Sequence, residues 1–193
     1  TMQTKILFAI GALAAVAAAQ FSVTVPPGYA SNVGNSNNVF PWGRAASSMR
    51  FQQVYDSTNW TNQGVNFPIL ITGMKFRPYP GATGTWAGGA WSALRVDFAT
   101  CPNDYLTPSA TFARVFNGAL TIPGGSVLGA GVVNPPHVDV ALPAPFLYDP
   151  AGGDFVFDVH VDGTTWTGGA VRGCDVVSGL TGAQGLALGS RIY

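Results

Sequence analysis

One short segment carries most of the side chains that can do chemistry. Between Asp154 and Asp162 the residues alternate between apolar and ligand-type side chains. In an extended chain Asp158, His160 and Asp162 project from the same face. Carboxylate oxygens and imidazole nitrogens both bind divalent cations, and carboxylate oxygens are the ligands that Ca²⁺ takes. The segment therefore predicts a strand with a candidate metal site, to which a second alternating strand can add His137 and Asp139.

The other face of this segment is apolar and predicts the inner face of a central strand. It consists of Phe155, Phe157, Val159 and Val161. The polar face also has a plainer interpretation, because a chain with few charges must place them on its solvated surface. Successive residues on one face lie about 6.6 Å apart, which is wide for a single ion. The interpretation as an ordinary solvated face is favoured, and it predicts that Asp158→Ala costs little stability.

Catalytic motifs are absent from the sequence. No Gly-x-Ser-x-Gly nucleophile motif occurs, and neither histidine lies near a serine along the chain. There is no glycine-rich phosphate loop, no His-Glu zinc motif and no dinucleotide-binding fingerprint. No aspartate is marked as one of a glycosidase pair. The sequence predicts a protein that is not an enzyme and has no organic cofactor.

Tryptophans in glycine-rich and polar surroundings suggest a binding role. The clearest are Trp86, Trp91 and Trp166. An indole face stacks on a sugar ring while neighbouring polar groups bind its hydroxyls, so these residues predict a possible glycan-binding site. Alternatively the rings fill the ends of the domain or contact another subunit, where tryptophan is also enriched. The second interpretation is the favoured one.

Cys101 and Cys174 are the two cysteines of the chain. In an exported protein an even number of cysteines most simply forms disulfides, so the pair predicts one bridge. Two buried thiols are the alternative. Their wide spacing matches no zinc-finger pattern.

The composition argues against helices and against polyanionic partners. The chain has no glutamate, and beyond the first twenty residues Lys75 is its only lysine, while it contains 25 Gly and 14 Pro. Such a chain is poorly equipped to cover helix surfaces. With nine basic and nine acidic residues the charge is balanced, which excludes nucleic acid or an anionic membrane as the expected partner.

Short alternating runs separated by Gly, Pro and Asn predict an antiparallel β-sandwich, jelly-roll-like, forming a single domain over residues 20–193. The expected strands, besides the N-terminal run considered below, are Met49–Tyr55, Ile69–Phe76, Leu94–Phe98, Thr111–Phe116, Leu120–Ile122, His137–Leu142, Phe155–Val161, Val171–Val177 and Leu186–Ile192.

Residues 1–19 have the features of a secretory signal peptide. Lys5 precedes an apolar run, and Ala17, Ala18 and Ala19 supply small residues before Gln20. The sequence therefore predicts export, to the medium or to the cell surface, although a retained N-terminal anchor is the alternative. No segment of the mature chain is long enough to span a bilayer, which takes roughly 20 apolar residues.

The first residues of the mature chain form a candidate assembly element. Phe21, Val23 and Val25 alternate with polar residues, and Pro26 and Pro27 then end the run. A strand set apart by such a break can add to the sheet edge of a neighbouring molecule. The alternative is that residues 20–25 form the first strand of their own sheet, and this alternative is favoured.

Four segments resemble a known family. They are Gly34–Gly43, Arg50–Tyr55, Ile71–Arg77 and Pro145–Pro150. Together they resemble a family of secreted bacterial proteins of uncharacterised function known from planctomycetes. The resemblance extends over most of the mature chain, implies an exported β-sandwich and supplies no catalytic residues.

Low charge and a high apolar content favour association over catalysis. Only 9% of residues are charged and 47% are hydrophobic, so little repulsion keeps copies apart. The expected function is that of a secreted structural or adhesive protein that forms homo-oligomers or polymers, such as a subunit of an extracellular filament or surface layer. A carbohydrate-binding module is the alternative.

Overall fold

The protein is almost entirely β-structure. The computed structural model describes residues 20–39, 41–42, 48–81, 84–101, 111–163, 165–170, 172–178 and 189–192, so the predicted signal segment lies outside the described residues. In these ranges the only helices are α1 (Thr58–Thr61) and the 3₁₀ turn η1 (Pro150–Gly152). The predicted all-β, antiparallel, sandwich-like fold is confirmed. None of the described helices has the length and apolar character needed to cross a membrane.

The strands vary from two-residue bridges to a strand of 13 residues. In chain order they are β1 (Ser36–Asn38), β2 (Met49–Tyr55), β3 (Ile69–Phe76), β4 (Thr85–Trp86), β5 (Gly89–Cys101), β6 (Ala113–Ile122), β7 (Gly125–Ser126), β8 (Val138–Tyr148), β9 (Asp154–Val161), β10 (Trp166–Gly168), β11 (Cys174–Val176) and β12 (Gly189–Ile192).

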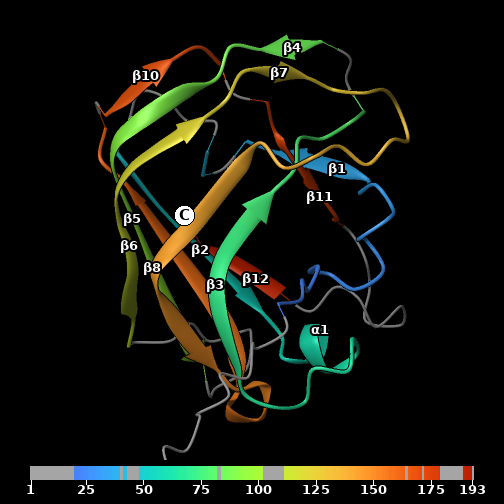
Figure 1. Cartoon of the computed structure of the whole chain (residues 1–193), viewed down its shortest axis with the longest axis vertical. Coiled ribbons are helices and arrows are strands. Elements are labelled where there is room, and N and C mark those ends of the chain that lie inside the picture. The colour runs from blue at the N-terminus through green and yellow to red at the C-terminus, as the bar shows by residue number, and fades with distance from the viewer. Residues whose placement is uncertain are drawn as a thin grey trace, which may run out of the picture.

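One large sheet and one two-stranded ribbon form the two main layers. The large sheet has the order β10-β5-β9-β2-β12, and β6 also pairs with β5. The ribbon consists of β3 and β8, which cross in front of the large sheet in Figure 1. Two small sheets, β1-β11 and β4-β7, lie toward one end. All of these pairs are antiparallel.

Strand β9 is central, as the sequence predicts. It pairs with β2 on one side and with β5 on the other. Its four apolar side chains, Phe155, Phe157, Val159 and Val161, are all buried in the main core. The ring of Phe157 contacts three other rings, those of Phe51, Tyr55 and Phe76. The predicted inner face is therefore confirmed.

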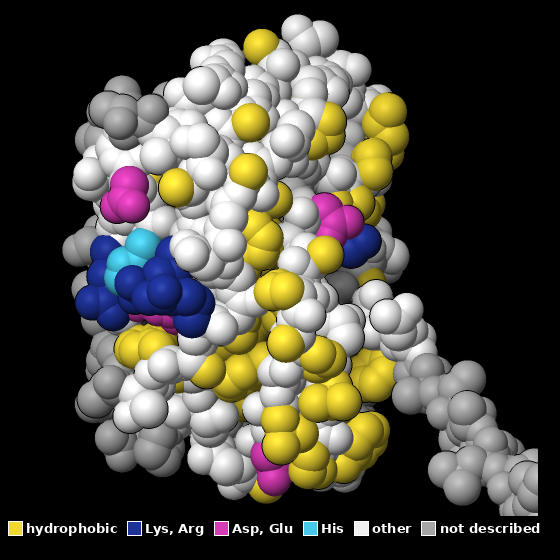
Figure 2. Space-filling view, turned by 60° about the vertical axis from the view of Figure 1, so that its left-hand side comes forward, with side chains coloured by type: hydrophobic (Ala, Val, Ile, Leu, Met, Phe, Trp, Pro, Cys, Tyr) yellow, Lys and Arg dark blue, Asp and Glu magenta, His cyan; other side chains and the backbone are white. Residues whose placement is uncertain are grey.

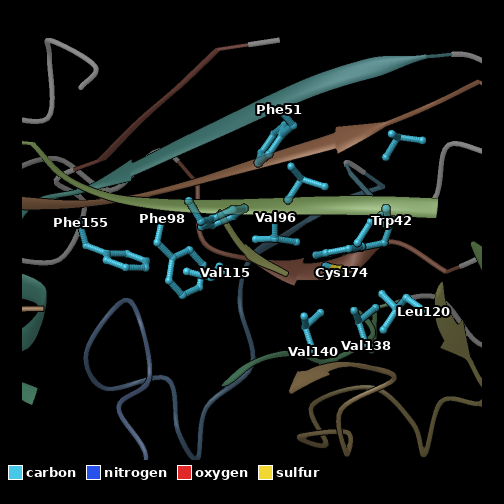
Figure 3. Packing of buried hydrophobic residues seen from close by; sticks show 14 of the residues in the cluster. Trp42, Phe51, Val96, Phe98, Val115, Leu120, Val138, Val140, Phe155 and Cys174 are labelled. Atoms are coloured by element: carbon cyan, nitrogen blue, oxygen red, sulfur yellow. The ribbon is translucent and has the colours of Figure 1, made fainter. Parts of the chain in front are cut away.

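The main core lies between the large sheet and the ribbon. Figure 3 shows Phe51, Val96 and Phe98 from the large sheet on one side, with Val138 and Val140 of β8 on the other. Packing of this kind follows from the period of two along each strand, which turns alternate side chains inward.

The predicted disulfide is wrong, because Cys101 and Cys174 are not bonded to each other in the structure and both are buried. Cys174 belongs to the main core between the layers. Cys101 lies with Ala99 and Val54 in a second apolar cluster. Since Phe98 points into the main core, the alternation along β5 turns Ala99 and Cys101 to the opposite face of the sheet. Burial, together with the charge of Asp175, raises the pKa of the Cys174 thiol to about 12.

The N-terminal segment is not a strand of this domain, contrary to the favoured expectation for residues 20–25. Val23 and Val25 pack against the core, whereas Phe21 is 57% exposed. The side chain of Gln63 donates to the carbonyl of Thr24 and accepts from its backbone N–H. A glutamine side chain thus takes the place that a neighbouring strand would occupy.

Candidate functional site

A group of charged side chains occupies the outer face of the large sheet. Adjacent strands contribute Arg50 from β2, His160 from β9, Arg95 from β5 and Arg114 from β6, which lie over two aspartates, Asp97 and Asp158. We call these six residues the arginine cluster. Each strand turns alternate side chains outward, so four strands suffice to gather it.

Two carboxylates form the base of the cluster. Asp97 and Asp158 are direct partners in the register of β5 and β9. Like charges placed opposite each other destabilise a sheet. Both aspartates are nevertheless buried, with exposed fractions of 4% and 0%. Two buried carboxylates on neighbouring strands must therefore be compensated by their surroundings.

Arginines from both sides supply that compensation. Arg50 donates from Nε at 2.9 Å and from Nη2 at 2.6 Å to Oδ2 of Asp158. The amide of Gln52 donates to the same oxygen at 3.0 Å. On the other side Arg95 donates through Nε to Oδ2 of Asp97 at 2.9 Å. Each carboxylate thus has an arginine of its own.

These contacts keep Asp158 ionised. Burial by itself raises the pKa of a carboxyl group, but the hydrogen bonds from Arg50 and Gln52, with the charges of His160 and Arg50, outweigh that effect. The pKa of Asp158 therefore lies below its ordinary value. The same hydrogen bond raises the pKa of Arg50.

His160 lies between the two halves of the cluster. Its Nε2 is 3.0 Å from Nη2 of Arg95 and 3.2 Å from Oδ2 of Asp158. A guanidinium only donates, so His160 accepts from Arg95 when its Nε2 carries no hydrogen, whereas an Nε2 that carries one can donate to Asp158. The histidine can therefore bond to either neighbour, depending on which ring nitrogen carries the hydrogen.

Positive groups lie outermost in the cluster and negative groups lie beneath them. The side chains of Arg50, Arg95 and Arg114 are 53%, 36% and 58% exposed, against 0% for Asp158. Figure 2 shows the basic side chains gathered around a histidine at one side of the molecule. Three arginines over two aspartates leave a surplus of one positive charge before the histidine is counted. The surface presented to solvent is positive.

The structure brings together only part of the predicted metal site. Asp158 and His160 meet, and Asp97 joins them, with donor atoms within 4.8 Å of one another. Asp162 is exposed and lies outside this group. The positive surplus opposes a bound cation. The sequence alone did not single out Asp97, although alternation within the expected strand Leu94–Phe98 puts Arg95 and Asp97 on one face.

The two other residues considered for the metal site belong to different surroundings. Asp139 pairs with Lys75 on the ribbon. The ring nitrogens of His137 face the carbonyl oxygens of Phe76 and Arg172 at 3.1 and 3.2 Å. Burial lowers the pKa of His137 more than these two contacts raise it. His137 is a buried core residue, and neither residue joins the arginine cluster.

The predicted tryptophan site does not form as a unit. Trp91 is fully buried and cannot stack on a sugar, which corrects its assignment as a ligand residue. Trp166 packs against it, with ring centroids 5.1 Å apart. Trp86 is partly exposed and lines a hollow of about 180 Å³ together with Pro123 and His137. Of the three tryptophans, Trp86 alone borders this hollow.

A second surface feature is the outer face of the ribbon, which we call the ribbon face. It consists of Leu70, Thr72, Lys75, Asp139, Ala141, Pro145 and Leu147. Leu70 and Leu147 are register partners, and each is 63% exposed. Figure 2 shows hydrophobic side chains collected across the lower half of the molecule. Adjoining exposed apolar residues of this kind mark interaction surfaces more often than isolated ones do.

Comparison of the chain with protein-family models, curated proteins and solved structures gives no match. What the protein does is therefore inferred from its own side chains.

Proposed function

We propose that the protein is an exported structural subunit that associates with copies of itself through the ribbon face. The observation that carries this proposal is the cross-strand pair of Leu70 and Leu147, together with Phe67, which is 50% exposed just before β3. Such residues gain most by burial against another apolar surface, about 25 cal/mol for each Å² removed from water. The occupant of this face is a second copy of the chain.

Charge complementarity supports a second copy as the partner. The ribbon face carries Lys75 and Asp139, which are register partners 2.9 Å apart. In an isologous contact the same patch meets itself, so Lys75 of each copy can lie opposite Asp139 of the other. The formal net charge of the whole chain is zero, so no general repulsion opposes the approach.

The edges of the ribbon provide a route from a dimer to a polymer. Within the described strands, β3 and β8 pair with each other and with no third strand. Open edges present backbone N–H and C=O groups to which a further strand can bond. An isologous contact by itself produces a closed dimer, so a filament requires a second contact, which strand addition at an open edge of the ribbon can supply.

Association of the mature chain, residues 20–193, tests the proposal. The substitution Leu70→Asp would place a charge inside the contact between two copies. We therefore expect the unchanged chain to form oligomers and the Leu70→Asp chain to be a folded monomer. Leu128→Asp is the matched control, because Leu128 is 65% exposed but lies outside the ribbon. Sedimentation velocity over a concentration series measures the oligomeric state, and circular dichroism verifies folding. A monomeric parent chain, or a Leu70→Asp variant that still associates normally, would exclude this role for the ribbon face.

A further inference from the structure

The arginine cluster contains more positive charge than its own carboxylates require. Arg50 pairs with Asp158, and Arg95 pairs with Asp97. Two other ion pairs of the described chain are one to one, Lys75 with Asp139 and Arg77 with Asp175. A network that served only to compensate two buried aspartates needs two arginines. Arg114 and His160 are additional to that need.

Arg114 is the least engaged of the three arginines. Its Nε lies 4.0 Å from Oδ1 of Asp97, which is beyond hydrogen-bond distance. That oxygen is buried and, within the described residues, has no hydrogen-bond partner. Arg114 is also the most exposed of the three. Its guanidinium is therefore free to turn toward a ligand without breaking a short contact.

The other two arginines are held in fixed orientations. Nε and Nη2 of Arg50 face Asp158, so its Nη1 group is left for an outside acceptor. Arg95 is held by Asp97 and by Nε2 of His160. Ion pairs that hold a guanidinium in place reduce the entropy lost when it binds a further acceptor. The buried aspartates thus act as supports for outward-facing donors.

We propose that the arginine cluster binds an oxyanion, of the sulfate or carboxylate type, through Arg50, Arg95 and Arg114. Guanidinium groups match such anions in charge and in the geometry of their N–H donors. A carboxylate or a sulfate ester adds the one negative charge that balances the surplus positive charge of the cluster, and a sulfate ion adds two. The same surplus disfavours the divalent cation suggested by the donor atoms of Asp97, Asp158 and His160.

The oxyanion has two possible sources, a free ion and a charged group on a polysaccharide. Sulfate ion represents the first. Dextran sulfate and polygalacturonate, which carry sulfate esters and carboxylates, represent the second, with neutral dextran as the uncharged control. Tighter binding of a charged polymer than of free sulfate, per charged group, indicates a polymer-borne ligand. The reverse indicates a free ion. Either result supports an oxyanion site.

Substitution of Arg114 tests whether binding occurs at the cluster. We expect Arg114→Gln to weaken binding of the best probe about tenfold, equivalent to losing one charge-assisted contact, with partial recovery in Arg114→Lys. Lys75→Gln removes the same charge from the ribbon face and should leave binding unchanged. Calorimetry and fluorescence polarisation at low salt measure affinity, and binding should weaken as NaCl is added.

Three outcomes would overturn the proposal. The first is that no charged probe binds to the folded, full mature chain. The second is that Arg114→Gln binds as tightly as the parent chain. The third is that Lys75→Gln weakens binding as much as Arg114→Gln, which would indicate attraction by overall charge alone. Association through the ribbon face is measured separately, so these results leave the Leu70→Asp experiment unaffected.

Discussion

The outer faces of the two layers differ in a way that residue type alone does not explain. On the large sheet an aspartate, Asp158, is completely buried. On the ribbon two leucines, Leu70 and Leu147, are each 63% exposed. Simple hydrophobicity would give the reverse order. The difference in exposure depends on whether neighbouring strands supply side chains that cover the residue.

Position within the sheet decides the exposure. Asp158 lies on β9 with β2 and β5 on either side, so long side chains from both neighbours cover it. Within the described strands the ribbon has only two members, so no flanking strand covers Leu70 or Leu147. A central strand can bury a charge under its neighbours' arginines, whereas a ribbon leaves its outer leucines in water unless another molecule covers them.

The largest expected effect comes from the inner face of β9. Phe157→Ala should lower the free energy of unfolding by about 3 to 5 kcal/mol, because it removes a ring in contact with three others and leaves a cavity. Urea unfolding followed by tryptophan fluorescence measures the change. A loss below about 1 kcal/mol, as for a surface position, would contradict the burial of this face.

The outer face of the same strand should be the next most sensitive. The sequence alone suggests that Asp158→Ala costs little, and the burial of Asp158 corrects this. We expect a loss of about 2 to 3 kcal/mol, because charge-assisted hydrogen bonds from Arg50 and Gln52 are removed. Asp162→Ala, at an exposed position directly after β9, is the matched control and should change stability by less than about 0.5 kcal/mol. Equal effects of the two substitutions would contradict the special position of Asp158.

Removal of the N-terminal segment separates the ribbon face from strand donation. Deleting residues 20–25 should lower stability by about 1 to 2 kcal/mol, since Val23 and Val25 each lose partial burial against the core. Association should persist, because the ribbon face is untouched. Thermal melts and sedimentation of both chains make the comparison. A stable but strictly monomeric truncated chain would instead favour donation of this segment to a neighbour.

The smallest effect is a pH dependence of stability. The pKa of Asp158 is lowered in the folded protein from its ordinary value of 3.8, so the folded state binds its proton less readily than the unfolded state does. The stabilising contribution is therefore complete above about pH 3.8 and is lost as the pH falls further, through the folded pKa. Asp158→Asn should lose less stability than the parent chain over this acid range. Identical pH profiles of the two proteins would contradict this assignment.

Local alternation was sufficient to predict several elements of the fold. Met49–Tyr55 and Ile69–Phe76 form strands β2 and β3 with the predicted bounds, and the apolar face of β9 is buried as expected. The runs Thr111–Phe116 and Leu120–Ile122 instead merge into β6, because Asn117 and Gly118 continue the pairing with β5. The short strands β4 and β10 were missed, since they rest on partners distant in sequence.

For the candidate sites, too, the sequence does not show which strands are neighbours. The sequence placed Asp158 and His160 on one face and Arg95 and Asp97 on another, but it did not reveal that these two strands are neighbours. That adjacency puts Asp97 opposite Asp158, so the residues of the candidate metal site belong to an arginine cluster. The number of cysteines predicts a bridge between Cys101 and Cys174, whereas in the structure they belong to different apolar clusters.

By itself the sequence determined roughly where the longer strands lie and which side chains share a strand face, because an extended chain alternates its side chains with a period of two. Tertiary structure decided which strands are neighbours, and through them which side chains are covered. Burial is set by contacts between residues far apart in the chain. For that reason the aspartate of β9 is enclosed by arginines, while the leucines of the ribbon remain available to a second molecule.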